Sequence, residues 1–378
     1  MDRVAIEQQF FRNSGLVSTF LVMAALCMTM LGMVMLFSAG AVRGAQDLLA
    51  KQAVWLVLAM IAAAVAAWID LDWLKKKTPL IFCICIFALI LTLVPSIGVK
   101  VNGAQRWIGL GPLRIQPSEF AKIGLVLGCA HYFALRQRTL GEFLDGFAIP
   151  SAFLGLVCGL ILLQPDFGTS FLCGAVGATL MFQAGTSLKW LMPVAGLAVT
   201  AFSVLVYFDP VRIRRVTSFL DVEANANDSA YQLWQGMLAF GVGGVDGVGL
   251  GMGRQQMHFL PEAHTDFIFP VIGEELGLVM TMCVLLCFLL LFGLTCWKLR
   301  GVTRLYDYLL AMGALLFVSF QAIINIGVVT GSLPTKGMSL PFISYGGSNL
   351  VVVFIMIGLV INVLRRMDQP KPIQPREM

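Results

Sequence analysis

Four carboxylates gather where a long polar segment gives way to an apolar one, within the stretch from His258 to Gly277. Asp266 stands at the transition itself. If the apolar side lies in a lipid bilayer, a carboxylate there is costly to keep and is functional by default. A carboxylate also suits a helix start, where it offsets the helix dipole, and Thr265 could cap such a helix. The residues alone leave both roles of Asp266 open.

Glu274 and Glu275 follow Asp266 by eight and nine residues. At about 1.5 Å per residue, a continuous helix would carry them roughly 12 Å deeper than Asp266. Because neither can face lipid cheaply, we expect both to face a cavity or a basic partner, with structural pairing favoured for at least one. His264, beside Asp266, could tune or share a proton, or could simply be solvated.

Several cations could bind an anion such as a phosphate. Arg106 precedes Trp107 in a glycine-rich segment, and its planar guanidinium suits phosphate, although a tryptophan at a membrane interface is routine. Lys336 lies among prolines and glycines, which permit non-helical backbone against a wet cavity. The basic cluster at 212–215 is equally compatible with phosphate and with lipid headgroups.

The composition places these residues in a membrane protein. Apolar residues make up 58% of the 378-residue chain and charged residues 12%, with a mean hydropathy of +0.85. No soluble globular domain has this composition, and the net charge of +5 says little about nucleic acid. The nine cysteines lie in or at the ends of apolar runs, so neither a disulfide framework nor a zinc site is expected.

Runs of about 20 apolar residues are needed to cross a bilayer as helices. The first run, 15–39, is too long for the apolar region of a signal peptide and is expected to be retained as a span. The sequence predicts an all-α, polytopic fold forming a single transmembrane domain, with spans at 15–39, 50–68, 79–97, 118–135, 147–163, 168–184, 188–207, 266–293, 306–330 and 345–364.

Ten spans put both termini on one side, and the positive-inside rule selects the cytoplasm. With that orientation the inner segments hold 15 Lys and Arg residues, against seven in the short outer loops and adjoining span ends. Every irregular segment then falls outside: 102–119, 164–169, 331–349 and the long loop 208–265. The spacing of Leu233, Met237 and Phe240 predicts an interfacial amphipathic helix within that loop. The proline-rich tail, 367–378, is expected to be disordered.

Four motifs identify a family resemblance. They are NGAQRWIGLGPLRIQPSEFAK at 102–122, QPDFGTS at 164–170, YQLWQGMLAFGVGGVDGVGLGMGRQQMHFLPEAHTDFIFPVIGEELGL at 231–278, and NIGVVTGSLPTKGMSLPFISYGGSN at 325–349. With the ten-span layout, they make the chain resemble the SEDS family (shape, elongation, division and sporulation) of bacterial cell-wall glycosyltransferases. LPEAHTDFIF and LPTKG look more like its division-type members than its elongation-type members. Asn349 departs from the family's usual residue.

The resemblance implies polymerisation of lipid II into glycan strands at the outer face of the bacterial cytoplasmic membrane. Asp266 matches the catalytic acid, expected to serve as a general base or as the organiser of a base in an inverting displacement that releases undecaprenyl pyrophosphate. Glu274 and Glu275 are the predicted supporting residues. The predicted substrate-binding residues are Arg106, Trp107, Glu119, Lys122, Asp166, Arg212, Arg214, Arg215, His264, Lys336 and Ser344.

The resemblance also implies partners, namely lipid II, the nascent glycan strand, a class B penicillin-binding transpeptidase and other division proteins. No resident cofactor is indicated, and a divalent cation such as Mg²⁺ or Mn²⁺ is a hypothesis, because the sequence holds no dedicated cage for one. The main alternative is a lipid II flippase, which buried acids and ten spans also fit. A flippase needs polar groups along both leaflets, whereas the unusual polar motifs here cluster outside.

Overall fold

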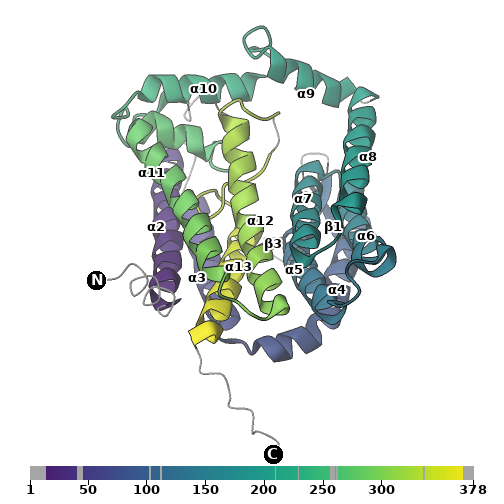
Figure 1. Cartoon of the computed structure of the whole chain (residues 1–378). Helices are drawn as coiled ribbons and strands as arrows, with labels where there is room; N and C mark the ends of the chain where they lie inside the picture. The colour runs from purple at the N-terminus through teal and green to yellow at the C-terminus, as the bar shows by residue number, and fades with distance from the viewer. Residues whose placement is uncertain are drawn as a thin grey trace, which may run out of the picture.

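The computed structural model describes residues 14–40, 46–101, 104–110, 113–208, 210–228, 230–255, 260, 263–334 and 337–368. It is a bundle of long helices with a layer of shorter elements at one end (Figure 1). The long helices are α2 (Ser14–Gly40), α3 (Gln46–Trp68), α4 (Leu71–Leu93), α5 (Pro117–Leu135), α6 (Ile149–Leu163), α7 (Phe167–Ala184), α8 (Leu188–Tyr207), α11 (Ile268–Leu299), α12 (Leu305–Val329) and α13 (Gly347–Asp368).

The predicted all-α, polytopic fold class is confirmed. Each predicted span coincides with one of these ten helices, to within a few residues at most ends. In the described chain, eight are long and apolar enough to cross a membrane: α2, α3, α4, α6 with the preceding π-helical turn η1 (Leu144–Ala148), α7, α11, α12 and α13. The crossings by α5 and α8 stay predictions.

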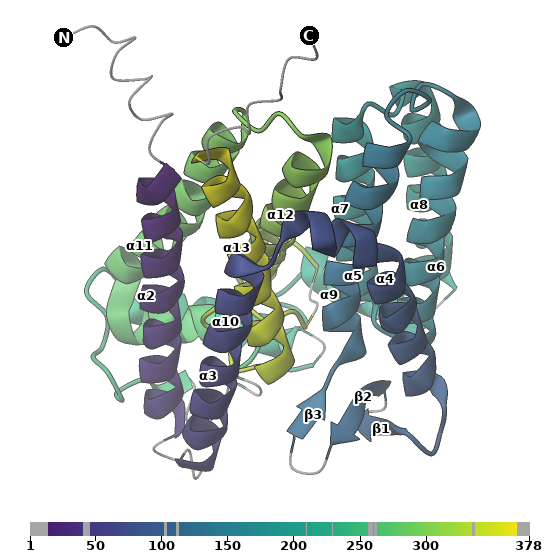
Figure 2. The same cartoon turned by 90° about the horizontal axis from the view of Figure 1, so that it is seen from below.

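Helices α12 and α13 form the centre of the bundle, with 83% and 78% of their apolar stretches buried. Helix α13 lies along α3 (Figure 2). Gly358 allows this close approach, because a Cβ there would lie 2.4 Å from the carbonyl oxygen of Ala63. The amide of Asn362 donates to the carbonyls of Ala66 and Ile69, which fixes the two helices at that end.

The two ends of the described chain meet. Ser14 donates from its hydroxyl to the carboxylate of Asp368 at 2.8 Å, so α2 begins where α13 ends. The short helices α9 (Pro210–Leu220) and α10 (Tyr231–Gly243) lie at the opposite end of the molecule (Figure 1). Helix α10 confirms that part of the long loop is helical. Helix α13 includes residues 367 and 368, two positions into the predicted disordered tail, and 369–378 lie outside the described residues.

A small antiparallel sheet replaces the irregular loop predicted over 102–119. Its strands are β1 (Gly98–Val101), β2 (Ala104–Leu110) and β3 (Leu113–Ile115), in the order β1-β2-β3. It lies at one end of the bundle, next to α4 and α5 (Figure 2). Strands β1 and β2 pair Val101 with Ala104, so two residues join them. The sheet holds Arg106 and Trp107 in defined positions that a loop would not provide.

Helix α11 breaks at Gly277, whose φ of 74° and ψ of −174° lie outside helical values. The chain changes direction there, and the part before the break lies alongside α10 (Figure 1). The 22 residues from Leu278 to Leu299 span about 33 Å and can cross a bilayer by themselves. Glu274 and Glu275 precede this break, so they do not lie on the straight stretch of α11 that is long enough to cross the bilayer.

Candidate functional site

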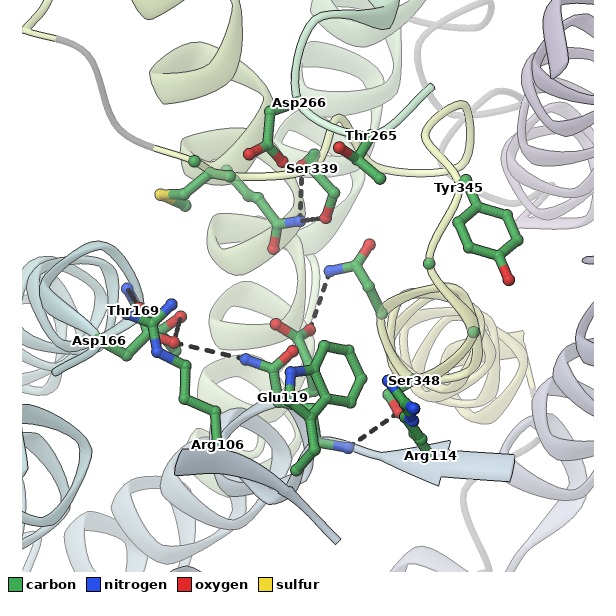
Figure 3. A pocket seen from close by; sticks show the side chains of 18 of the residues that line it. Arg106, Arg114, Glu119, Asp166, Thr169, Thr265, Asp266, Ser339, Tyr345 and Ser348 are labelled. Carbon is green, nitrogen blue, oxygen red and sulfur yellow. Dashed lines mark hydrogen bonds between the residues drawn. The ribbon is translucent and has the colours of Figure 1, made fainter. Parts of the chain in front are cut away.

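A polar cavity of about 700 Å³ opens at the end of the bundle that carries the sheet (Figure 3). The four irregular segments predicted from the sequence all contribute to it, although they are far apart in the chain. Arg106, Asp166, His264 and Tyr345 represent one segment each, and α3 adds Lys51 and Trp55. The segments that topology predicts on one side of the membrane thus line one cavity.

Asp266 lines this cavity in a half-buried position. It precedes Phe267, the cap residue of α11, so neither Thr265 nor Asp266 occupies the cap position. Asn325 of α12 donates to the backbone carbonyls of Asp266 at 2.8 Å and of Met338 at 2.5 Å, tying two segments of the site together. A Cβ at Gly337 would lie 2.5 Å from the Asp266 carboxylate, so a glycine there leaves the carboxylate its place.

A buried ion pair forms the floor of the cavity. The ammonium of Lys122 lies 2.8 Å from both carboxylate oxygens of Glu119, one helical turn earlier on α5. Gln321 of α12 accepts from the same ammonium at 2.9 Å, and Asn349 of α13 donates to Glu119 at 2.9 Å. Their hydrogen-bonding groups satisfy each other, which is what makes a buried ion pair tolerable. The floor thus joins three helices.

Asp166 forms a second anchored carboxylate. It caps α7, accepting from the backbone N–H and the hydroxyl of Thr169 at 3.2 and 2.9 Å, and it also accepts from Gln116 at 3.4 Å. The turn before it is held by Arg106, which donates to the carbonyls of Gln164 and Pro165. Arg106 therefore has a structural task and still presents its guanidinium to the cavity.

The segment before α13 closes another side. The Tyr345 backbone N–H donates to the His264 carbonyl at 2.9 Å, and the two rings lie 5.8 Å apart. Burial raises the pKa of the Tyr345 phenol, so this group stays protonated at neutral pH. A Cβ at Gly347 would lie 2.2 Å from the Trp55 ring, so glycine is needed for this segment to pack against α3.

The structure brings seven of the predicted catalytic and substrate-binding residues to the cavity wall: Arg106, Trp107, Glu119, Lys122, Asp166, His264 and Asp266. Among the other described ones, Ser344 lies just behind the wall, where its hydroxyl accepts from the Leu340 N–H at 2.7 Å. Arg214 lies on α9, away from the cavity lining, and pairs with Asp228. Arg212 and Arg215 also lie on α9, and Lys336 falls outside the described residues.

Glu274 and Glu275 are fully buried, but they lie outside the cavity lining. They accept hydrogen bonds from backbone amides of the segment 251–255, next to the break in α11. Ser38 of α2 lies 2.7 Å from both oxygens of Glu275. They support the fold around the start of α11 and have no place among the groups that face the cavity.

Sequence reasoning missed several cavity residues. Lys51 and Arg114 are exposed cations on the wall, whereas Lys122, predicted as an anion ligand, is occupied by Glu119 and Gln321. Gln321 could have been predicted, since a side-chain amide in the middle of an apolar span is costly unless it has a polar partner or a function. Nothing in the sequence distinguishes Lys51 and Arg114 as site residues, because cations at span ends are common.

The donor groups of the site do not form a metal cage. Among the described residues, no group of three or more His, Cys, Asp or Glu side chains is arranged to hold a metal ion. Each of the two anchored carboxylates, Glu119 and Asp166, is engaged by protein hydrogen bonds. The described side chains therefore do not fit a resident metal centre.

A polytopic helical bundle with an acid-lined polar cavity at one end defines a membrane-embedded protein with a site for a polar ligand. Residues 18–369 match the FtsW/RodA/SpoVE family, described as cell cycle proteins. The chain belongs to this family, which confirms the resemblance deduced from the motifs.

Similar proteins cover the chain almost completely. A probable peptidoglycan glycosyltransferase FtsW from Geobacter sp. strain M18 is 36% identical over 91% of this chain and 96% of its own. The corresponding protein of Coxiella burnetii is 39% identical over 83% and 85%.

Solved structures agree with these relatives. A chain from a peptidoglycan synthase complex that coordinates polymerization and crosslinking matches with a TM-score of 0.78 at 29% identity, covering 93% of this chain and 98% of its own. The rod shape determining protein RodA of Thermus thermophilus matches with a TM-score of 0.70 at 28% identity, over 93% and 97%.

Proposed function

We propose that this chain is a peptidoglycan glycosyltransferase that polymerises lipid II into glycan strands during cell division. Family membership and FtsW relatives that share 36–39% identity over most of the chain support this activity. The observation that carries it is Asp266 on the wall of a cavity that also holds exposed cations. A carboxylate base beside cations is the combination that glycosyl transfer from a pyrophosphate donor needs.

Asp266 is the proposed general base. It accepts the proton of the acceptor sugar hydroxyl as that oxygen forms a bond to the anomeric carbon of the donor strand. The bond from this carbon to the pyrophosphate oxygen breaks, and undecaprenyl pyrophosphate leaves with the bonding electrons. One displacement inverts an α-linked donor to a β-linked product, so one base and a stabilised leaving group suffice without a covalent intermediate.

The leaving pyrophosphate requires positive charge near it. Arg106, Arg114 and Lys51 line the cavity and are our candidates for this task. The guanidinium of Arg106 uses its Nε and one terminal nitrogen for backbone carbonyls, which fixes its orientation and leaves other N–H groups for phosphate oxygens. Lys122 is a weaker candidate, because its ammonium is already neutralised by Glu119.

We propose that a divalent cation such as Mg²⁺ or Mn²⁺ enters together with the substrate pyrophosphate. Magnesium is commonly held by one or two carboxylates plus substrate phosphates, so it does not require a preformed cage. Addition of EDTA should then stop polymerisation without lowering the thermal stability of the free protein. A loss of stability on adding EDTA would instead indicate a resident structural metal.

We further propose the inner bacterial membrane as the location, with both termini in the cytoplasm and the cavity on the outer face. The positive-inside count and the meeting of Ser14 with Asp368 support this orientation. The proposed partners are a class B penicillin-binding transpeptidase and other division proteins, supported by the similar chain in a peptidoglycan synthase complex.

The direct test uses purified protein in liposomes with lipid II, with and without the cognate transpeptidase. Wild type should produce glycan strands, and Asp266→Asn should lower the rate about 10²- to 10⁴-fold, as expected for loss of a general base. The variant should keep the thermal stability of wild type, which shows that it is folded. Lipid II that crosses the bilayer without being polymerised would favour a flippase instead.

A further inference from the structure

An exposed apolar loop lies between α10 and α11, outside the cavity. Val245, Val248, Leu250 and Met252 project from it, with exposed fractions of 59%, 38%, 53% and 68%. We call these four residues the apolar ridge. The intervening residues are mostly glycines, several with positive φ, so the four side chains project from a compact non-helical backbone. Such a set of exposed apolar side chains marks an interaction surface.

Most backbone N–H groups between Gly247 and Gly253 donate hydrogen bonds within the protein. Carbonyls of Gly243, Glu274 and Glu275 accept from the N–H groups of Gly247, Val248 and Gly249. In the next stretch the Glu275 carboxylate accepts from the backbone N–H groups of Gly251 at 3.1 Å and Gly253 at 3.4 Å. The Glu274 carboxylate accepts from those of Arg254 at 2.7 Å and Gln255 at 3.0 Å.

This arrangement is what a hydrocarbon environment demands. Non-helical backbone at membrane depth is tolerated only where its polar groups are satisfied by protein or a wet cavity. A loop in water would need no such arrangement, because water would serve its N–H groups. Two fully buried carboxylates are costly, and here they accept hydrogen bonds from backbone N–H groups that lipid could not hydrogen-bond.

The loop is continuous with surface that faces lipid. The Leu278 N–H donates to the Gly244 carbonyl at 2.9 Å, so the loop adjoins the start of the membrane-crossing part of α11. There Leu278 and Val279 are exposed by 53% and 58%. On the other side, the Gly251 N–H lies 3.0 Å from the Ser38 hydroxyl at the end of the α2 span, beside Phe37, which is exposed by 65%.

We propose that the segment Gly244–Gly253 is a membrane anchor whose apolar ridge inserts among the lipid acyl chains of the nearer leaflet. Two charged residues limit its depth: Asp246, exposed within the loop, and Arg254, exposed just after it, remain at the headgroups. The carboxylates of Glu274 and Glu275 make the insertion possible by satisfying the backbone. The inference is independent of the proposed activity, since it concerns lipid contact.

This anchor fixes the orientation of the part of α11 that precedes Gly277 and adjoins Asp266. The short helical stretch before Gly277 begins next to Asp266 and ends at the anchored loop. A Cβ at Gly277 would lie 2.2 Å from the Val245 carbonyl oxygen, so the break and the loop fit together closely. Lipid contact at the ridge therefore fixes one end of the element whose other end carries Asp266.

The test measures where the ridge lies in nanodiscs of phosphatidylethanolamine and phosphatidylglycerol. In wild-type protein, a phospholipid with a photoactivatable acyl chain should label the peptide that contains residues 245–252. In parallel, Leu250→Cys and Met252→Cys should react with a charged, water-soluble maleimide at least about tenfold more slowly than Asn227→Cys, an exposed control on the polar loop. Peptide mass spectrometry separates these sites from the native cysteines.

Equal maleimide rates at all three positions, together with no photolabelling of residues 245–252, would overturn the anchor. Fast labelling of the isolated protein that slows only when a partner protein is added would also overturn it, and would assign the ridge to a protein interface. The photolabelling uses the unaltered chain, so it decides the question even where a cysteine variant fails to fold.

Discussion

Asp266 and Glu275 lie nine residues apart in the same segment, yet they occupy opposite environments. Asp266 is half-buried on the wall of an open polar cavity. Glu275 is buried at the α11 break, and its carboxylate accepts from the N–H groups of Gly251 and Gly253 and lies 2.7 Å from the Ser38 hydroxyl. Both looked alike in the sequence, as acids in an apolar context.

The difference shows how to separate chemical from structural carboxylates in a membrane protein. A carboxylate that faces a wet cavity remains accessible to a substrate proton. A carboxylate surrounded by backbone donors stabilises an irregular chain that lipid cannot solvate. The Glu119 carboxylate shares features of both classes. It lines the cavity floor, yet its charge is neutralised by Lys122.

The largest effect on stability is expected for Lys122→Met. This substitution leaves the Glu119 carboxylate buried without its cation, which costs about 3–5 kcal/mol. The variant should lose most of its folded population in detergent, measured by thermal unfolding. The double variant Glu119→Gln/Lys122→Met removes both charges and should recover much of the stability. A single variant as stable as wild type would contradict a structural role for the pair.

Glu275→Ala should destabilise the protein by about 2–3 kcal/mol, since it removes the acceptor of the buried Gly253 N–H and one of the two acceptors of the Gly251 N–H. Glu275→Gln keeps a carbonyl acceptor in place and should cost less. Thermal unfolding of both variants in the same nanodiscs measures the difference. If Glu275→Ala unfolds like wild type but polymerises no lipid II, Glu275 belongs with the chemical carboxylates and the separation fails.

Gly337→Ala should affect activity and leave stability nearly unchanged. The added methyl group would stand 2.5 Å from the Asp266 carboxylate and push it out of place. A misplacement of about 1 Å can cost up to about 100-fold in rate, so a loss of about 10- to 100-fold is expected in lipid II polymerisation. Unchanged activity would show that the carboxylate position is not critical.

The smallest effect is expected for Arg214→Ala on α9. Its ion pair with Asp228 is more than half exposed, and such pairs contribute about 0–1 kcal/mol. Thermal unfolding and polymerisation should both stay close to wild type. A strong loss of activity would bring the basic cluster of α9 into substrate binding, and would extend the site beyond the cavity.

Much of the architecture could be predicted because hydrophobic length alone defines membrane spans. All ten predicted spans coincide with helices, and the four irregular segments that topology predicts on one side line the same cavity. The sheet was missed although Asn102-Gly103 is a strong hairpin signal between alternating residues. It was overlooked because glycine and proline in the same stretch were interpreted as irregular loop.

The rest depended on tertiary geometry that no spacing reveals. The break at Gly277 could not be deduced, since an isolated glycine in an apolar run is usually tolerated within a helix. A single straight span also gives no sign that Glu274 and Glu275 accept hydrogen bonds from the backbone of the segment 251–255. The pairing of Lys122 with Gln321 joins helices almost 200 residues apart in the chain.

The most direct test of the separation compares Asp266→Asn with Glu275→Gln in one preparation. Lipid II polymerisation and thermal unfolding are measured for both in identical nanodiscs. Asp266→Asn should retain the wild-type unfolding temperature and lose about 10²- to 10⁴-fold in rate. Glu275→Gln should unfold at a lower temperature and lose at most a few-fold in rate below that temperature. Vigorous polymerisation by Asp266→Asn would contradict the account.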